Sequence, residues 1–83
     1  MGKRIAVLGI VIDDLEMSQA VNAVLHEYSN IIIGRMGIPY HARNVAVISV
    51  AVDADTDSIS ALTGKLGKLK GVNVKAAISK SKT

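Results

Sequence analysis

The chain has 83 residues and a net charge of +3, and 49% of it is apolar although Phe, Trp and Cys are absent. This length accommodates one domain, and the lack of cysteine excludes disulfides, thiolate metal sites and cysteine nucleophiles. No apolar run approaches the ~20 residues that a membrane span requires, so we expect a cytoplasmic protein without a membrane partner.

The first predicted element is a strand over residues 3–12, whose β-branched run IAVLGIVI is typical of a strand buried on both faces. Asp13 and Asp14 end this strand, and either can cap the helix that follows. Asp13 with Glu16 three residues later resembles a capping box. Apolar residues then recur at helical spacing, which predicts an amphipathic helix over residues 16–28.

The next two elements form a predicted antiparallel hairpin. Residues 31–38 make a strand that contains Gly34 and Gly37, and glycine within a strand indicates a bulge or a close backbone approach. Pro39 is expected to end this strand. A wholly apolar strand follows over residues 45–52, and the short connection between the two strands favours a hairpin.

The last third of the chain predicts a helix and a strand. Residues 53–58 are rich in acids and hydroxyls that cap helices, and apolar residues follow at helical spacing: Ile59, Leu62, Leu66 and Leu69. Gly71 is expected at the C′ position of this helix. Residues 72–78 alternate as an edge strand does, and residues 79–83 are expected to form a frayed tail.

Six elements in this order predict one α+β domain over residues 1–83, with a ferredoxin-like β-α-β-β-α-β fold. Right-handed crossovers place both helices on one face of a four-stranded antiparallel sheet. The uninterrupted apolar strands, the first and third, then occupy the centre, and the strands with glycines or a lysine lie at the edges.

The two central strands carry apolar residues on both faces, whereas the helices cover only one face. A contiguous exposed apolar surface marks an interface. The sequence therefore predicts that the protein associates with itself, as a homodimer or tetramer that buries the open sheet face.

The hairpin holds the candidate ligand-binding residues Arg35, Tyr40, His41 and Arg43. Guanidinium forks and a phenol suit a carboxylate or a phosphate. The alternative is that the same residues form an interface or stabilise the turn.

No arrangement of residues indicates catalysis, so we expect a protein that is not an enzyme. His26 and His41 are the only histidines, and they lie on a predicted helix face and in a loop, which does not predict a metal site. No metal or other cofactor is expected.

Residues 65–83 contain six lysines and no acid. One interpretation is a solvated helix end followed by a soluble tail. The alternative is a nucleic-acid-binding surface, although no aromatic residue or arginine is interleaved with the lysines for base stacking.

Three stretches carry a resemblance to a known family: LHEY at 25–28, IGRMGIPY at 33–40 and ISALTGKLG at 59–67. With them, the chain resembles the iron-only ([FeFe]) hydrogenase system regulators over essentially its full length. The resemblance implies an ACT-like ferredoxin fold, related to the C-terminal sensing domain of nickel-responsive repressors. It also implies a regulatory or ligand-sensing role, with a small-molecule effector or a hydrogenase-system protein as partner.

The sequence departs from the nickel-responsive repressors in two respects. Those proteins carry an N-terminal ribbon-helix-helix DNA-binding domain, whereas the sensing-type fold here is expected to begin by Lys3. Their metal site uses several histidines and a cysteine, which this sequence does not offer. Nickel binding is therefore not expected of this chain, and neither is a direct repressor role.

Overall fold

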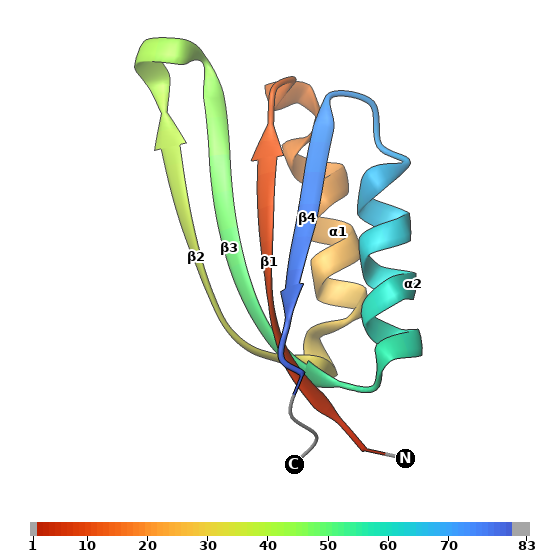
Figure 1. Ribbon diagram of the computed structural model, residues 1–83. Coiled ribbons are helices and arrows are strands. Elements are labelled where there is room, and N and C mark those ends of the chain that lie inside the picture. The colour runs from red at the N-terminus through yellow and green to blue at the C-terminus, as the bar shows by residue number, and fades with distance from the viewer. Residues whose placement is uncertain (1, 81–83) are drawn as a thin grey trace.

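A computed structural model describes residues 2–80 and has the predicted order of elements (Figure 1). The strands are β1 (Arg4–Ile12), β2 (Ile32–Tyr40), β3 (Val45–Ala54) and β4 (Val72–Ile78), and the helices are α1 (Ser18–Glu27) and α2 (Thr56–Gly67). The sheet is antiparallel throughout, in the order β2-β3-β1-β4. Both helices cover the same face of it (Figure 1), so the ferredoxin-like fold and the central position of β1 and β3 are confirmed.

The core lies between the sheet and the two helices, and alternate residues of the central strands enter it. The helix-facing residues of β1 are at most 1% exposed, namely Ala6, Leu8, Ile10 and Ile12. The leucine-rich stripe of α2 packs on them as the spacing predicts, since Ile59, Leu62 and Leu66 are also at most 1% exposed. From α1, Val21 and Leu25 complete this layer.

The start of the first helical segment differs from the expected capping box. A 3-10 turn over Leu15–Met17 precedes α1, and the carboxylate of Asp14, not that of Asp13, accepts a hydrogen bond from the backbone N–H of Glu16 at 3.1 Å. Asp13 instead binds the start of β4, where its carboxylate accepts from Asn73 Nδ2 at 2.8 Å. The tertiary contact with β4 removes Asp13 from the helix cap.

Strand β2 does not end at Pro39 as expected but continues to Tyr40, with Pro39 opposite Ala46 of β3. Because β2 is an edge strand, it tolerates a residue without a backbone N–H. The register shifts between Ile32 and Gly34, which confirms the irregularity that a glycine in this strand indicates.

Gly71 is not the C′ residue of α2, because the helix ends at Gly67 with Lys68 as its C-cap. Gly71 lies in the turn that enters β4, with φ at +73°. A Cβ at this position would lie 2.7 Å from Cβ of Asp14, so both the backbone angle and the space require glycine.

The segment 79–83, expected to be frayed, falls partly outside the described residues. Ser79 extends the pairing of β1 and β4, since its N–H donates to the carbonyl of Ile5 at 2.8 Å. The guanidinium of Arg4 donates to the carbonyl of Ser79 at 3.1 Å. Ser79 is thus bonded in the fold, and residues 81–83 lie outside the part of the chain that the structure describes.

Candidate functional site

The predicted site residues Arg35 and Tyr40 lie on opposite faces of the sheet. Arg35 is paired in register with Val50, which is fully buried under the helices, so Arg35 faces the helix side. Tyr40 is paired with Val45, one of the residues of β3 that alternate away from the helices. The strand therefore separates the guanidinium of Arg35 from the phenol of Tyr40.

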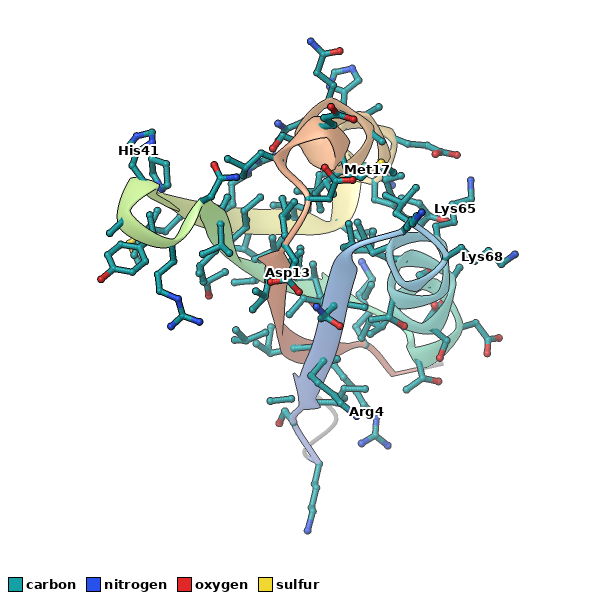
Figure 2. The ribbon with its side chains drawn as sticks, turned by 90° about the horizontal axis from the view of Figure 1, so that it is seen from above. Arg4, Asp13, Met17, His41, Lys65 and Lys68 are labelled. Carbon is teal, nitrogen blue, oxygen red and sulfur yellow. The ribbon has the colours of Figure 1, made fainter. Side chains whose placement is uncertain are left out.

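His41 and Arg43 lie in a 3-10 turn at the end of the hairpin, and both are exposed. Figure 2 shows His41 at the tip of this hairpin, apart from both helices. Asn44, with φ at 57°, closes the turn. The structure thus brings Tyr40, His41 and Arg43 together at one end of the hairpin and leaves Arg35 apart from them.

A groove of about 250 Å³ lies between α1 and the helix-facing side of the hairpin. It exists because the β2–β3 hairpin extends beyond the area that the helices cover (Figure 1). Arg35 lies in its lining and its Nη2 donates to Oδ1 of Asn22, on α1, at 2.6 Å. The remaining wall is mainly apolar, with Ile12, Pro39, Ala46 and Ile48 among its residues.

Sequence reasoning missed Asn22 and Ser18, the two polar residues that α1 contributes to this groove. The helical spacing of the apolar residues over 16–28 leaves Asn22 on the polar side of α1, and the structure has Asn22 exposed. This spacing does not tell which side chain of a distant edge strand lies opposite that helix. The contact between Arg35 and Asn22 spans 13 residues of sequence and depends on how far β2 extends past α1.

The second surface of interest is the face of the sheet that the helices leave uncovered, here called the open face. Its large apolar side chains are between 38% and 63% exposed, and they are Ile5, Val7, Val11, Met36, Ile38, Tyr40 and Val47. Strand register places them on the same side, because their partners in neighbouring strands also alternate away from the helices. Among the described strand residues, the charged side chains of this face are one acid and one base, Asp53 and Lys75.

Among the described residues, the lysines near the C-terminal end do not all lie on one surface. Nζ of Lys65 binds Oε2 of Glu27 at 2.7 Å and lies 5.7 Å from the ring centre of Tyr28, so it joins α2 to α1. The hydrogen bond to Glu27 raises the pKa of Lys65. Lys68, the C-cap of α2, lies near Lys65 (Figure 2), whereas Lys75 lies opposite Gly9 on the open face. This distribution does not favour a single nucleic-acid-binding surface.

The two histidines lie on separate elements, His26 in α1 and His41 in the hairpin turn. Within residues 2–80, no three His, Asp or Glu side chains lie close enough to hold a metal ion. Over the same residues, no helix has both the length and the apolar character to cross a membrane.

The fold is that of an ACT domain. The solution structure of the ACT domain from a GTP pyrophosphokinase of Chlorobium tepidum is similar to this chain, with a TM-score of 0.65 and 19% identity over 98% of this chain and 91% of that one. At this identity the comparison establishes the fold alone.

The chain belongs to the TM1266-like family, described as "Iron-only hydrogenase system regulator, putative", whose model matches residues 4–76. The structure of the uncharacterized protein TM1266 from Thermotoga maritima is similar, with a TM-score of 0.89 and 40% identity over 94% of this chain and 99% of that one. No curated protein matches the chain. The resemblance that the IGRMGIPY stretch carries is thus confirmed.

Proposed function

We propose that the protein is a regulatory module of the [FeFe]-hydrogenase system in the cytoplasm, which acts as a homo-oligomer and senses a small effector without catalysing a reaction. The family to which it belongs supports the regulatory role and the link to the hydrogenase. The ACT-like fold is compatible with sensing, although fold alone does not define a function.

The observation that carries the proposal is the apolar open face. Seven large apolar side chains on one face of a sheet are an unfavourable surface for a monomer in water. Four strands about 4.8 Å apart, with about nine residues at roughly 3.3 Å each, give this face a flat area of roughly 500–600 Å². A stable interface buries about 800 Å² of accessible surface per partner, and accessible area exceeds flat area on a corrugated surface.

The charges of the open face favour a second copy of the same chain as the occupant. One acid, Asp53, and one base, Lys75, leave the face without net charge, so two copies meet without repulsion. In a two-fold dimer each copy presents the same patch to the other. The proposed assembly is therefore a dimer with the two sheets face to face, and the helices outside.

Sedimentation velocity at micromolar concentration tests the assembly. The wild-type chain is expected to sediment as a dimer or tetramer, and Val47→Glu as a monomer, because the new carboxylate would be buried against apolar side chains. Gln19→Glu adds the same charge to the exposed side of α1 and is expected to leave the oligomer intact. A monomeric wild-type protein would overturn this assembly.

Deletion of the gene in its native host tests the regulatory role. We expect hydrogenase activity to change relative to the parent strain, and to return with the wild-type chain or with Gln19→Glu but not with Val47→Glu. Unchanged hydrogenase activity in the deletion strain would contradict the proposed link.

A further inference from the structure

The groove beside α1 contains a cation that no acid neutralises. Arg35 has one hydrogen-bond acceptor among the described residues, the side-chain oxygen of Asn22. Within the same residues no carboxylate lies within 4.0 Å of its guanidinium. Since a guanidinium has five N–H donors, most of those of Arg35 remain available to a ligand.

The polar groups around this cation favour an anion as its partner. Ser18 lines the groove, and its side-chain hydroxyl is a hydrogen-bond donor that suits an anion. A guanidinium fork binds a carboxylate or a phosphate with two parallel hydrogen bonds, and the planar carboxylate is the smaller of the two groups.

The size and walls of the groove limit the rest of the ligand. A volume of about 250 Å³ is below the range of roughly 300–1,000 Å³ that is typical of sites for drug-sized molecules. Its walls include Ile12, Ile48 and Pro39, and Gly37 contributes no side chain. A short branched apolar chain suits these walls better than a sugar or a nucleotide base.

We propose that this groove is the effector site, and that it binds a small monocarboxylate with a short apolar chain. Arg35 holds the carboxylate, Asn22 and Ser18 flank it, and the apolar walls bind the chain. This inference rests on the proposed function and deepens it, because it names the chemical class of the effector. It also separates Arg35 from Tyr40, His41 and Arg43, which lie outside the groove lining.

Isothermal titration with three probes tests the ligand class: isovalerate, its neutral isostere isovaleramide, and inorganic phosphate. Isovalerate is expected to bind, and isovaleramide to bind about ten-fold more weakly or worse, because a charge-assisted hydrogen bond is lost. Equal binding of acid and amide would overturn the role of Arg35. Binding of phosphate without binding of isovalerate would overturn the carboxylate class.

Three variants locate the site. Arg35→Gln is expected to weaken isovalerate binding about ten-fold or more. Gly37→Val fills the groove without a change of charge and is expected to weaken isovalerate binding. This variant should fold, because a Cβ at Gly37 lies at an ordinary contact distance of 3.9 Å from Cγ1 of Ile48. Arg43→Gln is the matched control, with the same loss of charge outside the groove, and is expected to bind as the wild type does. Loss of binding in Arg43→Gln with retention in Arg35→Gln would place the site at the hairpin tip and overturn the inference.

Sedimentation of the same samples separates this inference from the proposed function. If the wild type is oligomeric and affects the hydrogenase but binds no monocarboxylate, the groove site is wrong and the proposed function stands. If the wild type is a monomer, the proposed assembly fails whatever the titration shows.

Discussion

Gly71 is the residue whose replacement has the most direct structural consequence. Its φ of +73° disfavours any side chain, and a Cβ would meet Cβ of Asp14 at 2.7 Å. We expect Gly71→Ala to lower the free energy of unfolding by about 2 kcal/mol or more, as measured by urea denaturation at fixed protein concentration.

The matched control is Gly64→Ala, in the interior of α2. Apart from the adjoining residues and backbone of its own helix, no atom of the described residues lies within 4 Å of a Cβ at Gly64, and alanine is favoured over glycine within a helix by about 1 kcal/mol. The same substitution is thus expected to stabilise the protein at one position and destabilise it at the other. A loss of stability in both variants would contradict the special role of Gly71.

Asp55 gives the protein a specific pH dependence. Its carboxylate accepts a hydrogen bond from the backbone N–H of Ser58 at 2.7 Å, which caps α2 and holds the pKa of Asp55 below its usual value. A depressed pKa in the folded state means that the cap stabilises the protein fully above the unfolded pKa and is lost as the pH falls through the folded pKa.

Asp55→Asn keeps an oxygen that can cap the helix but does not titrate. We expect this variant to lose less stability than the wild type between pH 5 and pH 2, as shown by urea denaturation across that range. Parallel pH profiles for the two proteins would show that Asp55 does not contribute in this way.

At the scale of elements, α2 depends on a narrow stripe of leucines. Leu62 has no exposed surface, whereas Leu69, after the end of the helix, is only half-buried. We expect Leu62→Ala to destabilise the protein by about 2–5 kcal/mol and Leu69→Ala by clearly less, as measured by thermal or chemical unfolding. Equal losses would indicate that the stripe does not distinguish core from periphery.

The elements and their order could be predicted because their patterns are local. Leu62 and Leu66 repeat at helical spacing, and the apolar runs of β1 and β3 suit the two central positions of a four-stranded sheet. The wrong predictions for Asp13 and Pro39 both arise from tertiary structure. Asp13 binds Asn73 of β4, which is far away in sequence, and Pro39 is tolerated within β2 because β2 lies at the sheet edge. Local propensity does not contain this information.

At the scale of the whole molecule, the stability should depend on protein concentration. If the native state is an oligomer and the unfolded state is not, mass action raises Tm as the concentration rises. We expect a higher Tm at 100-fold greater concentration for the wild type and a constant Tm for Val47→Glu, as measured by circular dichroism. A Tm of the wild type that does not change with concentration would argue against self-association.

The candidate site could be predicted only in part. The candidate residues of the hairpin can be identified in the sequence. Their separation follows from the alternation of side chains along a strand, because Arg35 and Tyr40 are five residues apart and so face opposite sides of the sheet. Asn22 is recognised only once α1 is placed beside β2. The partners of a surface cation come from tertiary geometry, whereas the cation itself is read from the sequence.

The hydrogen bonds between Arg4, Ile5 and Ser79 have a consequence for protein engineering. They hold the outer ends of β1 and β4 side by side, at the end of the sheet away from the hairpin tip (Figure 1). Neighbouring ends of this kind permit circular permutation. A short linker from Ser79 to Arg4, with new ends in the exposed turn His41–Arg43, would reorder the elements as β3-α2-β4-β1-α1-β2 while it leaves both the groove residues and the open face on the same strands and helices.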